Sequence, residues 1–121
     1  MQVLESSEDY LERILILSEK FEKVREIDIV NDMGFSKPSV SIAMKKLKEN
    51  GYINIEGGAL TLTPKGHEIA MRIYERHLIL TKAFMMLGVD EETAAKDACK
   101  VEHDISEQTF QKIKERVEKN G

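Results

Sequence analysis

A short apolar segment, a glycine turn, a second amphipathic segment and a hairpin follow one another in the first half of this 121-residue chain. Val24 to Met33 predicts a short helix that Gly34 ends, because glycine readily adopts the left-handed conformation after a last helical turn. Ser36 caps the next helix, which ends at Asn50-Gly51. The apolar residues expected to face inward are Ile27, Val30 and Met33 on the first helix and Val40, Ala43, Met44 and Leu47 on the second. Two helices joined by a tight turn are typical of a helix-turn-helix.

The residues after this helix pair alternate in polarity as two short strands do. Residues 52–55 and 60–63 alternate between apolar and polar side chains, and residues 56–59 supply a glycine-containing turn. A two-stranded wing directly after a helix-turn-helix is far more specific than either motif alone. The sequence therefore predicts a mainly α fold, with a winged helix-turn-helix DNA-binding domain in residues 1–70 and an all-helical domain in residues 71–121.

Helical periodicity extends on both sides of the winged motif. Residues 6–23, 64–87, 91–103 and 106–117 are each predicted to be helical. Asp90 and Ser106 are suitable capping residues for the last two helices. The apolar stripe of the first helix is Tyr10, Ile14, Leu17 and Phe21.

The composition excludes several classes of protein. With 41% hydrophobic and 33% charged residues, the chain is long enough for one compact unit or a small domain with a helical extension. A single Cys rules out an intramolecular disulfide and favours a reducing compartment. The N-terminus turns polar at once, and no apolar run approaches the roughly 18 residues of a membrane span. We therefore expect a cytoplasmic protein with no membrane partner.

The second helix of the motif carries the residues expected to meet DNA. The net charge of −4 argues against a general nucleic-acid coat, but residues 37–48 contain four Lys and no acid. The candidate DNA-binding residues are Lys37, Pro38, Ser39, Ser41, Lys45 and Lys46. Lysine neutralises phosphate, and serine hydroxyls bond phosphate or base edges. The alternative is a solvated lysine face with no partner.

Specificity and affinity need more than this one helix. It has no Arg or Asn before Asn50, so DNA shape is expected to carry part of the specificity. A single small winged helix domain is expected to bind DNA weakly. A homodimer on a palindromic double-stranded operator is therefore the default expectation.

Three kinds of metal donor meet at the end of the 91–103 helix. Cys99, Glu102 and His103 are three and four residues apart, so they share a helical face and offer a thiolate, a carboxylate and an imidazole. The candidate ligands elsewhere are His77 on the long helix and Asp9 and Glu12 on the first helix. Our hypothesis is that these pieces meet around one metal. The alternatives are a buried Cys beside a solvated Glu-His pair, a core histidine, and helix-start acids favoured by the helix dipole.

Six short motifs spread along nearly the whole chain belong to one known pattern. They are Glu8-Asp9-Tyr10-Leu11-Glu12, Lys37-Pro38-Ser39-Val40-Ser41, Leu62-Thr63-Pro64-Lys65-Gly66, Arg76-His77, Gly88-Val89-Asp90 and Cys99-Lys100-Val101-Glu102-His103. In this combination the chain resembles the diphtheria-toxin-repressor and manganese-transport-regulator family of metal-dependent bacterial repressors. The resemblance implies an N-terminal winged helix domain and a helical metal-binding and dimerisation domain in residues 71–121.

The resemblance also implies which candidates are ligands. Positions matching ligands in both the iron and manganese branches are His77, Glu102 and His103; those matching the manganese branch are Asp9 and Glu12; Cys99 agrees with the iron branch. Two further iron-branch ligand positions hold Thr81 and Ala95, which cannot ligate. Carboxylates suit Mn²⁺, whereas a thiolate favours softer ions. We therefore expect Mn²⁺ or Fe²⁺ as the cofactor, with Co²⁺ or Zn²⁺ binding in vitro.

The implied function is a metal-dependent transcriptional repressor of metal-ion homeostasis genes, and not an enzyme. The main alternative is a winged helix DNA-binding regulator that needs no metal. A second alternative is a zinc hydrolase built on Cys99, Glu102 and His103. It is poorly supported, because the sequence contains no phosphate loop, no nucleophile elbow and no His-Glu-x-x-His helix. A DNA-free interaction module would show no salt-dependent DNA binding.

Overall fold

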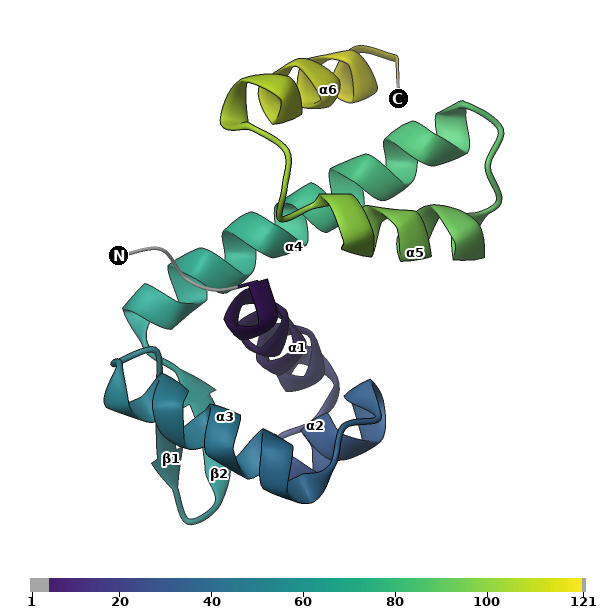
Figure 1. The fold of residues 1–121 in the computed structure, drawn as a ribbon. Helices are drawn as coiled ribbons and strands as arrows, with labels where there is room; N and C mark the ends of the chain where they lie inside the picture. The colour runs from purple at the N-terminus through teal and green to yellow at the C-terminus, as the bar shows by residue number, and fades with distance from the viewer. Residues whose placement is uncertain (1–4, 121) are drawn as a thin grey trace. The chain divides into compact units, whose positions relative to one another are not determined.

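The computed structural model describes residues 5–120, which form two compact units (Figure 1). The first unit extends to Met71 and the second begins at Arg72. The elements in chain order are α1 (Glu5–Lys20), α2 (Glu26–Met33), α3 (Lys37–Glu49), β1 (Ile53–Glu56), β2 (Ala59–Leu62), α4 (Pro64–Met86), α5 (Glu91–Val101) and α6 (Glu107–Asn120). The predicted fold class, mainly helical with one winged hairpin, is confirmed. None of the described helices combines the length and the apolar character needed to cross a bilayer.

In the first unit, α2 and α3 form the predicted helix-turn-helix. Gly34 ends α2 in the left-handed conformation with φ 73°, and its N–H donates to the carbonyl of Val30 at 2.9 Å. The hydroxyl of Ser36 accepts the N–H of Ser39 at 3.3 Å and so caps α3. The residues of α3 that are buried are Val40, Met44 and Leu47. The helix thus presents one face to the core and leaves the other exposed.

The wing is an antiparallel hairpin whose register runs from Ile53 opposite Leu62 to Glu56 opposite Ala59. Val24, in the segment before α2, extends this pairing, because its carbonyl accepts the N–H of Leu60 at 2.7 Å. The hairpin is therefore tied to the connection between α1 and α2.

Two sequence expectations for the first unit are wrong. α1 ends at Lys20, so Phe21 lies outside the helix and is 46% exposed. Ile27 was expected to face inward but is 42% exposed, and Ile29 is fully buried instead. A helix of only eight residues can be rotated about its axis in several ways that each turn apolar residues inward. Tertiary packing decides which of these rotations is adopted.

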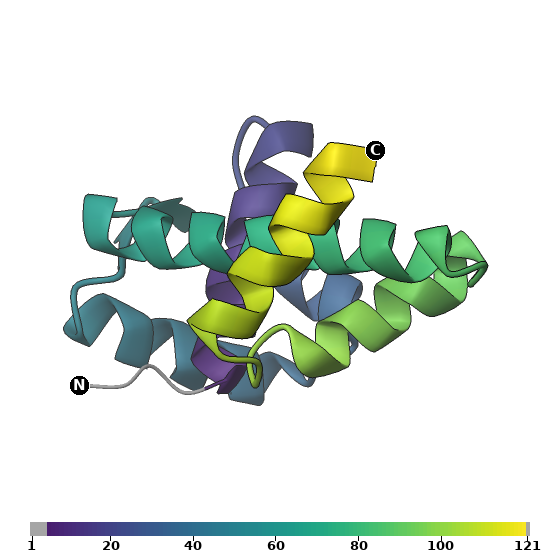
Figure 2. The same cartoon turned by 90° about the horizontal axis from the view of Figure 1, so that it is seen from above.

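In the second unit, α5 returns beside α4, and α6 crosses it (Figures 1 and 2). Arg76 of α4 stabilises the segment that connects α5 to α6. Its Nη1 donates to the carbonyls of Glu102 at 3.1 Å and Ile105 at 2.9 Å. Its Nη2 donates to Glu107 at 2.8 Å, and the guanidinium lies 5.2 Å from the centroid of the Phe110 ring. Because Arg76 is only 8% exposed, these bonds satisfy polar groups that water hardly reaches.

The ends of α5 differ from each other in how clearly the sequence marks them. At its start, the Asp90 carboxylate accepts the N–H of Thr93 at 3.1 Å and its hydroxyl at 2.9 Å, which holds the pKa of Asp90 below its ordinary value. At its end, Val101 is the last helical residue, Glu102 is the C-cap and His103 lies in the following turn. The predicted helix up to His103 is therefore two residues too long.

Candidate functional site

A thiol, an imidazole and a carboxylate converge inside the second unit. His77 comes from α4, Cys99 from α5 and Glu102 from the C-cap of α5. The Nδ1 atom of His77 lies 3.0 Å from Oε2 of Glu102 and 3.7 Å from Sγ of Cys99. The donor atoms of these three residues all lie within 4.8 Å of one another.

Local sequence explains why these side chains meet. Cys99 and Glu102 are three residues apart at the end of α5, so they lie on one side of the helix. The same helix buries Ala94 and Ala98, whose small side chains favour a close approach of packed helices. Since α5 returns beside α4, His77 is brought to the same point.

Glu102 is the central residue of the cluster, and its side chain is fully buried between two imidazoles. Its Oε2 contacts His77, while its Oε1 lies 3.5 Å from Nε2 of His103. Within the described residues, Oε1 makes no hydrogen bond. Buried carboxylate oxygens nearly always have a partner. A bound cation would supply the partner that this carboxylate oxygen lacks, and the thiol and the two imidazoles beside it are further possible ligands.

The protonation of His77 supports the same interpretation. Hydrogen bonds with Cys99 and then Glu102 raise the pKa of His77 to about 10, although burial acts in the opposite direction. The Nδ1 proton therefore lies where a sulfur and a carboxylate oxygen converge. Transition metals bind such donors at about 2.0–2.3 Å, so donors around one ion lie no more than about 4.6 Å apart, and the distances of 3.0 Å and 3.7 Å from Nδ1 of His77 meet this limit. The residues present thus fit a divalent transition metal.

The two acidic candidates, Asp9 and Glu12, lie on α1 in the first unit. Glu12 is only 2% exposed and Asp9 is half-buried. Both lie beyond the first turn of α1, where the helix dipole has little effect. Helix-start stabilisation therefore does not account for them.

All six candidate DNA-binding residues lie on α3 and are exposed: Lys37, Pro38, Ser39, Ser41, Lys45 and Lys46. Ile42 was not predicted as part of this surface, but it lies among these residues on α3 and is 60% exposed. Helical residues are about 100° apart, so Ile42 lies about 200° from the buried Val40. An apolar residue out of phase with the buried set was the signal that could have identified it.

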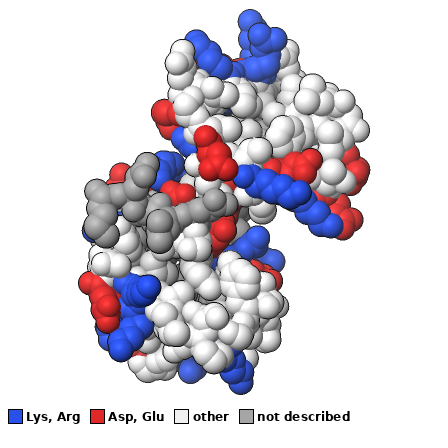
Figure 3. Space-filling model, in the orientation of Figure 1, with Lys and Arg blue, Asp and Glu red and all other residues white. Residues whose placement is uncertain are grey.

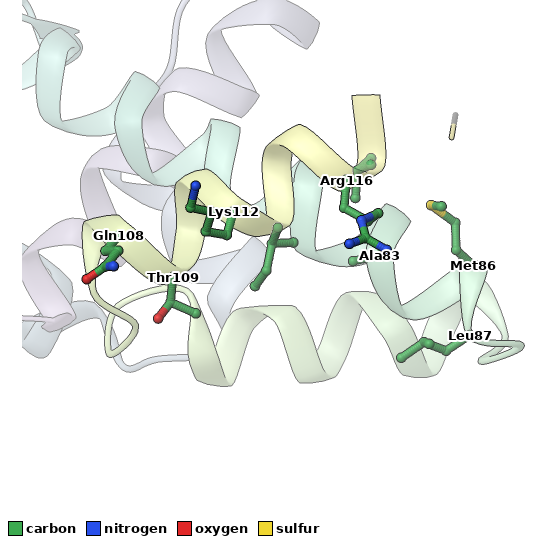
Figure 4. Close-up of a pocket in the computed structure, with 9 residues that line it drawn as sticks. Ala83, Met86, Leu87, Gln108, Thr109, Lys112 and Arg116 are labelled. Carbon is green, nitrogen blue, oxygen red and sulfur yellow. The ribbon is translucent and has the colours of Figure 1, made fainter. Parts of the chain in front are cut away.

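α4 and α6 leave an apolar groove in the second unit (Figure 4). Its volume is about 510 Å³, and its lining includes Ala83 and Met86 from α4, Leu87 from the turn after α4, and Ile113 and Val117 from α6. Leu87 is 80% exposed and Met86 is 49% exposed. Exposed contiguous apolar surface usually marks an interaction site.

Comparison with known proteins links both units to one kind of regulator. Residues 2–58 match a family model described as the N-terminal DNA-binding domain of iron-dependent repressors, and residues 63–120 match the model of their metal-binding and dimerisation domain. The chain is 37% identical over 119 residues to an HTH-type transcriptional regulator of Methanocaldococcus jannaschii, covering 95% of this chain and 94% of that protein. It is 34% identical over 114 residues to the HTH-type transcriptional regulator MntR of Lysinibacillus sphaericus, covering 93% and 82%.

Solved structures show the same arrangement of elements. A manganese-dependent transcriptional repressor in complex with manganese superposes with a TM-score of 0.84 at 27% identity, over 92% of this chain and 52% of that one. The T. acidophilum protein IdeR superposes with a TM-score of 0.81 at 26% identity, over 96% and 55%. The chain therefore spans about half the length of these two structures.

Proposed function

This chain belongs to the iron-dependent repressor family, and we propose that it is a repressor that binds double-stranded operator DNA as a homodimer when loaded with Mn²⁺ or Fe²⁺. The family resemblance of its motifs is confirmed by these matches. In this proposal residues 1–70 bind DNA, and residues 71–121 bind metal and dimerise. The regulated genes serve metal-ion homeostasis, the protein acts in the cytoplasm, and no enzymatic step is involved.

The cluster of His77, Cys99 and Glu102 carries the proposal. It supplies three donor atoms within 4.8 Å of one another in a chain that also has a DNA-reading helix. By their match to the family's ligand positions, the proposed further ligands are Asp9, Glu12 and His103. When bound, a divalent cation supplies positive charge that offsets the carboxylates of this set.

The switch follows from the charges of the chain's own residues. In the proposed site, the carboxylates of Asp9 and Glu12 join that of Glu102, and like charges that share a buried site repel one another. This repulsion disfavours the assembled site. Neutralising it favours the arrangement of the dimer that fits the operator, with a coupling free energy of about 1–3 kcal/mol.

The direct test is DNA binding by anaerobically purified protein with Mn²⁺, Fe²⁺, Co²⁺, Zn²⁺ or a chelator. The probe is a duplex selected from a random-sequence pool by the metal-loaded protein. We expect the chelator to weaken binding by about 5- to 150-fold. Binding that is equally tight with metal and with chelator would refute the switch and leave a regulator that needs no metal.

We further propose that the dimer forms through the groove between α4 and α6. The family domain that covers residues 63–120 is described as one of metal binding and dimerisation, and it includes the whole groove. Met86 and Leu87 expose apolar surface there that a second copy of the chain would bury. Basic residues of α6, Lys112 and Arg116, lie at the same groove (Figure 4).

A further inference from the structure

An exposed isoleucine lies in the middle of the DNA-reading face of α3. Ile42 is 60% exposed, and among the large apolar side chains of residues 5–120 only Leu87 is more exposed. Phe35, another exposed apolar residue of this unit, packs edge-on against the ring of Tyr10 at 6.0 Å between centroids. Folding of the first unit therefore does not explain why position 42 is apolar.

The neighbours of Ile42 are suited to the DNA backbone. Its helical neighbours three and four residues away are Pro38, Ser39, Lys45 and Lys46, and all are exposed. α3 carries no acidic side chain before Glu49. Figure 3 shows one face of the molecule, on which basic residues form separate patches with uncharged surface between them. Lysines that hold phosphates would direct an apolar side chain between them towards the floor of the major groove.

We propose that Ile42 reads thymine in the operator through the 5-methyl group. Among the four bases, only thymine presents an apolar group in the major groove. The side chain of isoleucine has no hydrogen-bonding atom, so it would desolvate the amino group of cytosine or the acceptors of guanine without replacing their bonds. It therefore favours thymine and disfavours the other bases. This assignment rests on the proposed operator binding and adds a determinant of sequence specificity.

The test removes one methyl group from the DNA. The metal-loaded full chain first selects duplexes from a random-sequence pool, and each thymine of the selected duplex is then replaced singly by deoxyuridine, which lacks only that methyl. We expect one or two positions in each half-site at which affinity falls roughly three- to fivefold, the value of one buried methyl group. At those positions Ile42→Ala should bind the thymine and deoxyuridine duplexes equally well.

Two controls separate base reading from general binding. Because Ile42 is exposed, Ile42→Ala should leave the thermal unfolding midpoint unchanged. Lys46→Ala should weaken the binding of all duplexes to a similar degree and reduce the salt dependence of binding, while keeping the preference for thymine over deoxyuridine.

The possible failures are distinguishable. If the wild-type chain selects no duplex with any of the four ions, the proposed function fails and this assignment fails with it. If operator binding occurs but deoxyuridine has no effect at any position, or has the same effect on Ile42→Ala, only the assignment to Ile42 is overturned. The exposed isoleucine would then belong to a protein contact.

Discussion

At the scale of single residues, His77 is the link between Cys99 and Glu102 in the metal-free protein. His77 shares its Nδ1 proton with Cys99 and Glu102, and its pKa rises from an ordinary 6.5 to about 10. The folded chain therefore binds this proton more tightly than the unfolded chain does. A cation and the proton compete for the same donors, so metal affinity should rise with pH.

The linked prediction concerns the stability of the metal-free protein. A raised histidine pKa gives stability that is fully present below pH 6.5 and is lost as pH rises to about 10. Urea unfolding in the presence of a chelator at pH 6, 8 and 10 should show this decline for the wild type. His77→Gln should lack it, and His67→Gln, which changes an exposed histidine outside the cluster, should retain it. An identical decline in His77→Gln would contradict the assignment.

A second residue-scale prediction concerns the choice of metal. Sulfur is the one soft donor in the cluster, and softer ions gain most from it. Cys99→Ser should therefore lower the binding affinity for Zn²⁺ and Co²⁺ by about tenfold or more and the affinity for Mn²⁺ much less. Competition against a chromophoric chelator measures the affinities. Lys100→Ser, at the neighbouring exposed position, serves as the control, and equal losses for all three ions would exclude a ligating thiolate.

At the scale of elements, the start of α4 touches the backbone that precedes the wing. The Thr63 hydroxyl accepts the N–H of Gly66 at 3.1 Å, and the N–H of Thr63 donates to the carbonyl of Tyr52 at 3.1 Å. A Cβ at Gly66 would overlap that carbonyl oxygen and lie 3.0 Å from its carbon. The close approach therefore requires glycine at this position.

Gly66→Ala tests this contact between elements. Alanine gains up to about 1 kcal/mol of helix propensity, but overlap with backbone atoms costs more than that, and the backbone cannot rotate away. The expected net loss is about 2 kcal/mol in the free energy of unfolding by urea. Glu68→Ala, exposed on the same helical turn, should stay within about 0.5 kcal/mol of the wild type. Equal stability of Gly66→Ala would show that the wing shifts freely.

The elements with strong local signals could be predicted, and those decided by tertiary packing could not. Gly34 predicted the end of a helix, and Ser36 and Asp90 predicted helix starts, because capping depends on local chemistry. α5 ends at Val101 without a glycine stop, so nothing in the sequence placed His103 outside the helix. The carbonyl groups that Arg76 binds are common to every residue and leave no sequence signal.

The candidate site was predictable only in part, for a similar reason. Helical spacing joined Cys99 and Glu102, but their approach to His77 depends on the direction in which α5 returns. The contribution of Asp9 and Glu12 stays a prediction from the family pattern.

At the scale of the whole molecule, the groove between α4 and α6 is the proposed contact of the dimer. Leu87→Glu places a charge on its most exposed apolar residue and should raise the dimer dissociation constant by at least about tenfold, because burying a charge in an apolar contact is costly. Sedimentation equilibrium measures this constant. Gln111→Glu adds the same charge to α6 outside the groove and should leave the dimer intact. A Leu87→Glu dimer as tight as the wild type would move the contact elsewhere.

The exposed Ile42 of α3 has one more chemical consequence. Its side chain gains apolar contact from a methyl group at C5, whichever pyrimidine bears that group. Cytosine methylated at C5 displays that group at the same place as thymine. Enzymatic methylation of a host genome would therefore alter what this helix recognises while every letter of the promoter stays the same.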